Sequence, residues 1–96
     1  MTREDVLKIL REDKIFLQNN FGVRSIGLFG SYSKNNQDEN SDVDFFVDIN
    51  EPLVKNYFGL WSYLEKRLNK KIDLIRKGNH LREKFIRTVE KEIIYA

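Results

Sequence analysis

Apolar residues along the 96-residue chain follow helical spacing in some segments and strand spacing in others. Near the start they recur every three or four positions, which predicts one helix over residues 3–19. Thr2 and Asp5 have the spacing of a capping box at its beginning, and the Asn and Gly residues at 19–22 are expected to end it. Residues 23–29 form a short apolar run that is typical of a buried strand, which ends at Gly30 and Ser31.

Residues 42–49 alternate between apolar and mostly polar side chains, and this period of two predicts a strand with one apolar face. The positions on that face are Val43, Phe45, Val47 and Ile49. Asn50 and Pro52 are expected to open the next helix, as its N-cap and as an early residue of its first turn. The apolar stripe of this helix continues to about residue 69, although Gly59 weakens its middle.

The last third of the chain predicts one more strand, over residues 71–75, and one more helix. The helix is indicated by apolar residues at a spacing of four: Leu81, Phe85, Val89 and Ile93. The predicted order of elements is therefore α-β-(α)-β-α-β-α. It describes one domain of residues 1–96 with an α/β (α+β) fold, in which helices pack against a three-stranded sheet.

The composition excludes several classes of function. Without Cys, the chain has no disulfide framework, no thiolate metal site and no cysteine nucleophile, and its single His argues against a His-rich zinc site. No apolar run approaches the ~20 residues that span a bilayer, and the polar start of the chain does not resemble a signal peptide. We therefore expect a soluble, cytoplasmic domain that does not bind membranes.

Charge is distributed unevenly, although the net charge is only +2. Residues 1–65 carry seven Lys or Arg and eleven Asp or Glu, a balance of −4, whereas residues 66–96 carry ten and four, a balance of +6. This basic third is either a solvated helix face or a surface that attracts phosphates, RNA or an acidic partner. Its cations are interleaved with Glu83, Glu90 and Glu92, and no aromatic stacking platform accompanies them. We therefore expect it to meet a partner protein rather than to bind nucleic acid tightly.

The candidate chemistry is concentrated in three acidic residues. Asp42 and Asp44 stand at alternate positions of the second predicted strand and therefore point to the same side. Asp73 lies inside the short third strand, and it would stand beside the other two if these strands are neighbours in the sheet. Crowded carboxylates repel one another unless cations neutralise them. Mg²⁺ is the natural choice, because it takes carboxylate oxygens and binds together with nucleoside phosphates.

Gly30 and Ser31 supply the second half of the predicted site. A glycine at a strand end lets the backbone approach a ligand closely, and the turn after it offers N–H groups to phosphate oxygens. Each feature alone has a plain interpretation, with Gly-Ser as a turn, Asp-x-Asp as a strand edge facing water and Asp73 as a paired structural carboxylate. Their joint arrangement, with ten residues between Ser31 and Asp42, favours a nucleotide site.

Two segments carry a resemblance to a known family. Residues 28–32, Leu-Phe-Gly-Ser-Tyr, and residues 41–47, Ser-Asp-Val-Asp-Phe-Phe-Val, resemble the signature of the polymerase β superfamily of nucleotidyltransferases. More narrowly, they resemble the minimal nucleotidyltransferase (MNT) antitoxins that are encoded beside HEPN-domain toxins. The resemblance covers nearly the whole chain and implies a polymerase β-like core, with a mixed three-stranded sheet and about four helices.

The resemblance also implies an activity. Asp42, Asp44 and Asp73 would be the catalytic carboxylates and hold two Mg²⁺ ions, Gly30 and Ser31 would hold the triphosphate of ATP, and Asp73 would orient the attacking hydroxyl or accept its proton. The expected reaction transfers AMP to a tyrosine hydroxyl of a partner HEPN ribonuclease toxin, so that the chain acts as an antitoxin. The alternative is a catalytically silent antitoxin that neutralises its partner by complex formation.

The length of the chain leaves no residues for a second domain that would hold an acceptor, so we expect the acceptor to be a protein bound in trans. Other polar residues are weaker candidates for the site. Asp48 is interpreted as an exposed carboxylate, and His80 as a residue at the entry to the last helix. Arg76 and Lys77 either face the phosphates or are solvated.

Overall fold

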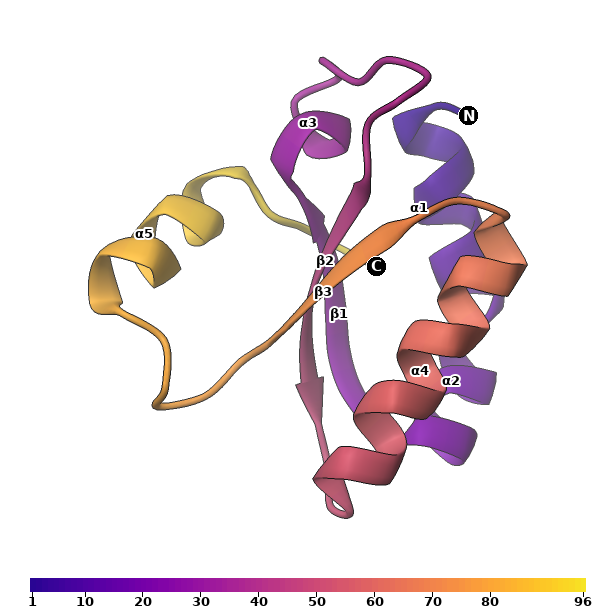
Figure 1. The fold of residues 1–96 in the computed structure, drawn as a ribbon, viewed down its shortest axis with the longest axis vertical. Coiled ribbons are helices and arrows are strands. Elements are labelled where there is room, and N and C mark those ends of the chain that lie inside the picture. Colours follow the sequence, from indigo (N-terminus) through magenta and orange to yellow (C-terminus); the bar gives the residue numbers. More distant parts are fainter.

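A four-stranded mixed sheet lies at the centre of the computed structural model, which describes all 96 residues (Figure 1). Along the chain the elements are α1 (Arg3–Glu12), α2 (Lys14–Phe21), β1 (Val23–Phe29), α3 (Gly30–Ser33), β2 (Val43–Ile49), α4 (Leu53–Leu68), β3 (Ile72–Arg76), α5 (Glu83–Glu92) and β4 (Ile94–Tyr95). The strand order is β3-β2-β1-β4. β1 runs antiparallel to both of its neighbours, and β2 is parallel to β3. The predicted fold class is confirmed, with one strand and one helix more than expected.

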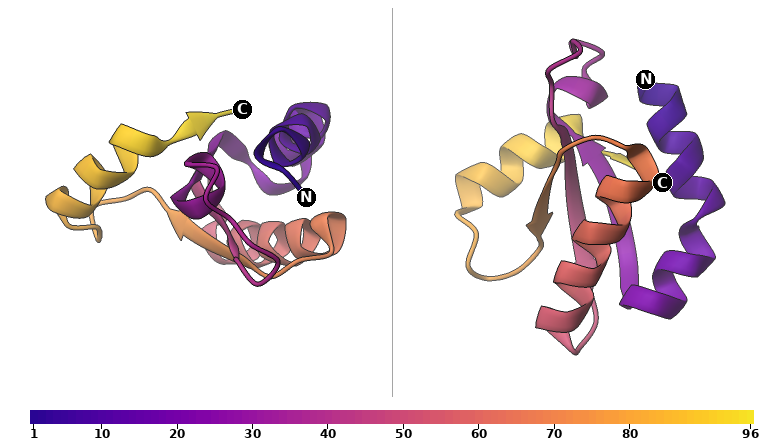
Figure 2. Two further views of the ribbon diagram at one scale, coloured as in Figure 1. Left: turned by 90° about the horizontal axis from the view of Figure 1, so that it is seen from above. Right: turned by 45° about the vertical axis from the view of Figure 1, so that its right-hand side comes forward.

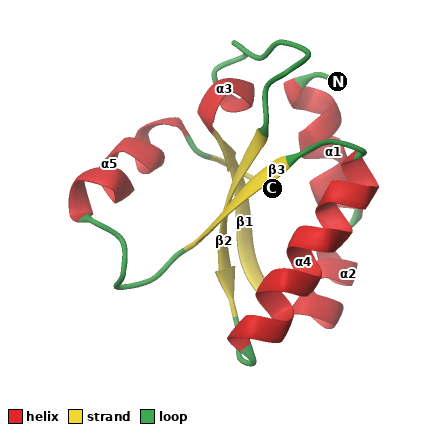
Figure 3. Ribbon diagram, viewed as in Figure 1, coloured by secondary structure: helices red, strands yellow, loops and turns green.

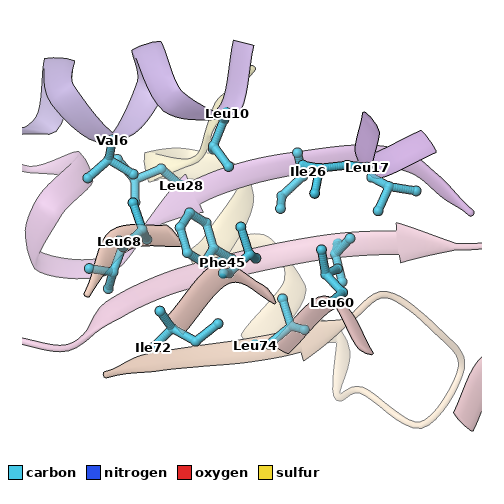
Figure 4. Packing of buried hydrophobic residues seen from close by; sticks show 14 of the residues in the cluster. Val6, Leu10, Leu17, Ile26, Leu28, Phe45, Leu60, Leu68, Ile72 and Leu74 are labelled. Carbon is cyan, nitrogen blue, oxygen red and sulfur yellow. The ribbon is translucent and has the colours of Figure 1, made fainter. Parts of the chain in front are cut away.

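Helices cover the two faces of the sheet unequally (Figure 2). α1, α2 and α4 lie on one face, and α5 lies alone across the other. The three-helix face holds the main core of 17 buried residues, in which the predicted apolar positions of β2 meet leucines from the helices. Figure 4 shows Phe45 of β2 among Leu10, Leu28 and Leu60. Most of the hydrophobic stabilisation is therefore on this side of the sheet.

The opposite face has a separate, much smaller core beneath α5. It consists of Phe29, Phe46 and Val89, with the Phe29 and Phe46 rings in an edge-to-face arrangement at 6.5 Å between centroids. Phe46 is only 4% exposed, so the expectation of a single apolar face on β2 is wrong. The reason is a long-range one, because α5 returns some 40 residues later to cover this side chain.

The first predicted helix is two helices, with the break at Asp13. The Asp13 carboxylate accepts hydrogen bonds from Tyr63 Oη at 2.7 Å and from Arg67 Nε at 3.0 Å, both on α4. These contacts hold the chain at the point where it changes direction. The predicted capping box of Thr2 and Asp5 is present at the start of α1, with both of its hydrogen bonds formed.

α4 begins two residues later than expected, because Asn50 is not its N-cap. The Asn50 side chain accepts a hydrogen bond from Arg24, and the Glu51 carboxylate accepts from the Leu53 N–H instead. Pro52 occupies the N-cap position. The helix then runs unbroken through Gly59, where a Cβ would lie 3.0 Å from the Phe21 ring of α2. No helix of the structure combines the length and the apolar character that a membrane crossing requires.

The end of the chain differs most from the prediction (Figure 3). α5 is confined to Glu83–Glu92, and Ile93, which was expected to continue it, leads into the two-residue strand β4. β4 pairs with Gly27 and Leu28 at the edge of β1. A Cβ on Gly27 would lie 2.6 Å from the Ile93 side chain, so this glycine allows the last segment to cross β1 closely.

Candidate active site

Parallel pairing of β2 with β3 brings two of the predicted carboxylates side by side. Asp44 and Asp73 are register partners on these strands, and Asp44 is also opposite Phe29, the last residue of β1. Neighbouring strands lie about 4.8 Å apart, so both carboxylates rise from adjacent backbone positions on the face covered by α5. The conditional expectation that Asp73 stands beside Asp44 is confirmed.

Asp42 lies one residue before β2, at the open edge of the same group. It and Asp73 are exposed, whereas Asp44 is half-buried between them and the end of β1. Burial, and after it the charges of Asp73, Asp42 and Glu92 in that order, together raise the pKa of Asp44 from its ordinary 3.8 to about 6. The three predicted carboxylates therefore form one electrostatic unit.

The backbone conformation of Gly30 lets it lie against these carboxylates. It follows β1 with a φ of +73°, in the left-handed region that favours glycine, and it starts the short helix α3. A Cβ on Gly30 would collide with the carboxylate oxygen Oδ2 of Asp44. The glycine thus lets the turn approach Asp44 itself.

The rest of the Gly-Ser turn is held by its own hydrogen bonds. The Ser33 hydroxyl donates to the Gly30 carbonyl at 2.9 Å, and the Ser31 carbonyl accepts from the Asn36 N–H at 2.9 Å. Ser31 is half-buried beside Gly30. Both predicted nucleotide-binding residues therefore stand at the end of β1, with Gly30 directly against Asp44.

The donor set suits magnesium bound together with a phosphate ligand. The three carboxylates do not form a preassembled cage, and no group of three or more His, Cys, Asp or Glu side chains is arranged to hold a metal ion alone. Mg²⁺ binds through one or two carboxylates and takes its remaining oxygens from water and substrate phosphates. Burial is the main cause of the raised pKa of Asp44, and the neighbouring carboxylates add to it, so a cation bound here would relieve their mutual repulsion.

Two residues at this site were missed by the sequence reasoning. The Glu92 carboxylate accepts a hydrogen bond from the Gly30 N–H at 3.3 Å, and its other oxygen pairs with Lys34 Nζ at 2.9 Å. A signal was available, because Glu92 continues the apolar stripe of Phe85 and Val89 at positions +7 and +3 of α5. An acidic residue on the covered face of a helix points toward the sheet beneath it.

Three weaker candidates lie away from the carboxylates. Arg76 is the last residue of β3, three positions beyond Asp73, and its guanidinium contacts His80 Nδ1 at 3.3 Å rather than the Gly-Ser turn. Asp48 stands opposite Ser25 near the far end of β2. The structure therefore separates Arg76, His80 and Asp48 from the group around Asp44.

A Gly-Ser turn beside carboxylates on two adjacent strands is the arrangement of an enzyme that transfers nucleotides. Comparison with known proteins agrees, because the model of the polymerase β nucleotidyltransferase family matches residues 12–96. The chain belongs to this family and is a nucleotidyltransferase.

Individual relatives match over almost the full chain. The protein adenylyltransferase MntA of Thermococcus cleftensis is 40% identical over 97 residues, which cover 100% of this chain and 97% of the relative. A solved structure described as a proposed minimal nucleotidyltransferase superposes with a TM-score of 0.80 at 26% identity, over 98% of this chain and 95% of the other. A chain from a crystal structure of a toxin-antitoxin with AMP-PNP gives a TM-score of 0.69 at 25% identity, over 88% and 69%. The narrower resemblance to minimal nucleotidyltransferases is thereby confirmed.

Proposed function

We propose that this chain, as one nucleotidyltransferase domain of residues 1–96, transfers AMP from ATP to a hydroxyl of a partner protein. The observation that carries the proposal is the pairing of Asp44 with Asp73 next to the Gly30 turn. The name of its relative MntA, a protein adenylyltransferase, supports a protein as the acceptor. We further propose that the partner is a HEPN-domain ribonuclease toxin, that the acceptor is a tyrosine, and that the modification makes the chain an antitoxin.

The proposed roles follow from position. Asp42 and Asp44, with Asp73, would hold two Mg²⁺ ions together with the triphosphate, and Gly30 and Ser31 would donate hydrogen bonds to its phosphate oxygens. Bound Mg²⁺ supplies positive charge that neutralises the triphosphate and lowers the pKa of a hydroxyl nearby. Asp73 is the more exposed of the register-paired carboxylates, so it is the one that an acceptor from another protein can reach.

The reaction balances with these residues alone as acid-base partners. The acceptor oxygen forms a bond to the α-phosphorus of ATP, and the bond from that phosphorus to the oxygen bridging to the β-phosphate breaks, which releases pyrophosphate. Asp73 orients the acceptor hydroxyl and accepts its proton. Asp44 lies against the Gly30 turn, where a Cβ would collide with its carboxylate.

The experiment is a mass measurement on the partner. The purified HEPN protein encoded beside this chain is incubated with the chain and Mg–ATP, and intact-protein mass spectrometry counts the AMP units added. We expect addition by the wild type and a loss of rate of about 100-fold or more for Asp73→Asn, because general-base steps contribute at least that much. ATP binding should be largely kept in this variant, because Asp42 and Asp44 remain to hold the metal with the triphosphate. Asp48→Asn is the matched control, since it removes one charge from the same sheet away from the site.

A second arm separates catalysis from occupancy. The variant with Asp42, Asp44 and Asp73 all changed to Asn is tested for neutralisation of the toxin in cells. We expect it to fail while still binding the partner. If the wild type adds no nucleotide and the triple variant still neutralises the toxin, the enzymatic proposal is overturned and neutralisation by complex formation stands.

A further inference from the structure

The Glu92 carboxylate is bound to two donors that a phosphate group at this site would need, the Gly30 N–H and Lys34 Nζ. Its Oε1 accepts the Gly30 N–H at 3.3 Å and its Oε2 pairs with Lys34 Nζ at 2.9 Å, so both carboxylate oxygens are engaged by donors. The Glu92 side chain is only 16% exposed, whereas that of Lys34 is 54% exposed. Two oxygens of a phosphate group take the same kinds of partner, a backbone N–H and an ammonium group, that the two oxygens of this carboxylate have.

The backbone around Glu92 is fixed on both sides. Three residues earlier, Val89 is 1% exposed in the small core with Phe29 and Phe46. Two residues later, Ile94 pairs with Leu28 of β1. α5 therefore cannot leave the site without breaking both attachments, and the Glu92 side chain can leave it by rotation about its own bonds.

Glu92 also adds negative charge beside the carboxylates of the site. Its negative charge contributes, after burial, Asp73 and Asp42, to the rise in the pKa of Asp44. Since both of its oxygens face donors rather than an open coordination position, the contacts favour an anion that holds the place of phosphate over a metal ligand.

We propose that Glu92 is an internal competitor of the nucleotide. In the free protein it satisfies Gly30 and Lys34, and binding of Mg–ATP exchanges both donors from the Glu92 carboxylate to the triphosphate while the side chain turns away. Glu92 thereby sets the ATP concentration at which the nucleotide site becomes occupied. This inference rests on the proposed nucleotide site and adds a determinant of its affinity.

The test compares two glutamates of the same helix. Isothermal titration with AMP-PNP and Mg²⁺ is carried out on the full chain for the wild type, Glu92→Gln and Glu90→Gln, the last being an exposed residue of α5 with the same change in charge. We expect Glu92→Gln to tighten the Kd by about three- to tenfold, because the competing charge-assisted contact is gone, and Glu90→Gln to leave it within about twofold. Equal effects of the two variants, or weaker binding by Glu92→Gln, would overturn the proposal.

A spectroscopic readout follows the exchange directly. In the free protein, the Gly30 amide resonance is expected to move on Glu92→Gln and to stay unchanged on Glu90→Gln. At saturation with Mg–AMP-PNP, the Gly30 resonances of wild type and Glu92→Gln should converge, because phosphate then holds the amide in both. A difference that persists at saturation means that Glu92 keeps its contact, and the proposal fails.

Failure of the nucleotide site itself has a different signature. If neither the wild type nor Glu92→Gln binds Mg–AMP-PNP, the proposed function and this inference fall together. If the wild type binds and Asp44→Asn abolishes binding, but Glu92→Gln binds as the wild type does, only the competition is refuted.

Discussion

The two faces of the sheet divide stability and chemistry between them. The face under α1, α2 and α4 carries the 17-residue core and no residue of the candidate site. The face under α5 has a core of only three residues, and it also carries Asp44, Asp73 and Glu92. A small enzyme can place repelling carboxylates on one side of a sheet because the other side supplies most of the apolar burial.

Adjacent phenylalanines of β2 allow this division to be measured. Phe45 is fully buried in the main core and Phe46 is 4% exposed in the small one, so Phe45→Ala and Phe46→Ala remove the same atoms from opposite faces. We expect Phe45→Ala to lower the free energy of unfolding by about 3–5 kcal/mol. For Phe46→Ala we expect a smaller loss, about 2–3 kcal/mol, since α5 can settle into the space.

Denaturant unfolding monitored by far-UV circular dichroism checks both values. Phe46→Ala should also tighten Mg–AMP-PNP binding, because it loosens α5 and with it the Glu92 contacts that compete with the nucleotide, whereas Phe45→Ala at temperatures where it remains folded should bind normally. Equal losses of stability, or weakened binding only in Phe45→Ala, would contradict the division between the faces.

The turn at Gly30 affects both stability and chemistry, and a substitution there is expected to have the next largest effect. Gly30→Ala combines a left-handed φ of +73° with a collision against the Asp44 carboxylate. We expect a loss of about 1–3 kcal/mol in the free energy of unfolding, measured by thermal and denaturant melts, and loss of AMP transfer because Asp44 is displaced.

Gly78→Ala is the matched control for this glycine. A Cβ there would meet only the ends of the His80 and Arg76 side chains, which can move aside. It should stay within about 0.5 kcal/mol of the wild type and keep full activity. A wild-type melt for Gly30→Ala would mean that the turn tolerates a side chain.

The Asp44 side chain is expected to lower the free energy of unfolding of the metal-free protein rather than to raise it. Because burial and neighbouring carboxylates raise its pKa to about 6, the ionised form is disfavoured in the folded state. In EDTA, the contribution of this group to the free energy of unfolding should fall as the pH rises from about 4 to about 6, and stay low above that. Asp44→Asn should therefore raise the free energy of unfolding by about 1–2 kcal/mol at pH 7, a value reduced for solvent screening at this half-buried site.

The measurement is a set of chemical melts between pH 4 and pH 8 in EDTA. The difference between Asp44→Asn and the wild type should shrink toward pH 4. A lower stability of Asp44→Asn at pH 7 would identify Asp44 as a structural carboxylate instead.

The local sequence pattern predicted the face under α1, α2 and α4 better than the face under α5. The period of two along β2 and the Asp-x-Asp motif placed the main core and the carboxylates, since each depends on residues close in sequence. The burial of Phe46 and the position of Glu92 depend on α5, which returns from about 40 residues away. β4 has only two residues, too few for any periodic signal, and the break at Asp13 depends on side chains of α4. The assignment of roles at the site stays a prediction until the variants are measured.

The smallest effect is expected for the basic third of the chain, residues 66–96, which runs from the end of α4 through β3 and α5. Its +6 balance already counts Glu83, which pairs with Arg87 at 2.5 Å. Arg67 is in addition engaged by Asp13 and Glu12, which lie outside this segment. We therefore expect fluorescence anisotropy to detect only weak binding of a labelled single-stranded RNA at low salt, and none at about 200 mM salt. Arg87→Gln, which removes an exposed cation, should leave even the low-salt binding nearly unchanged, because a single phosphate contact is worth little. Tight RNA binding that persists at ~200 mM salt and weakens on Arg87→Gln would make α5 a nucleic-acid surface, and the small face would then serve two ligands instead of one.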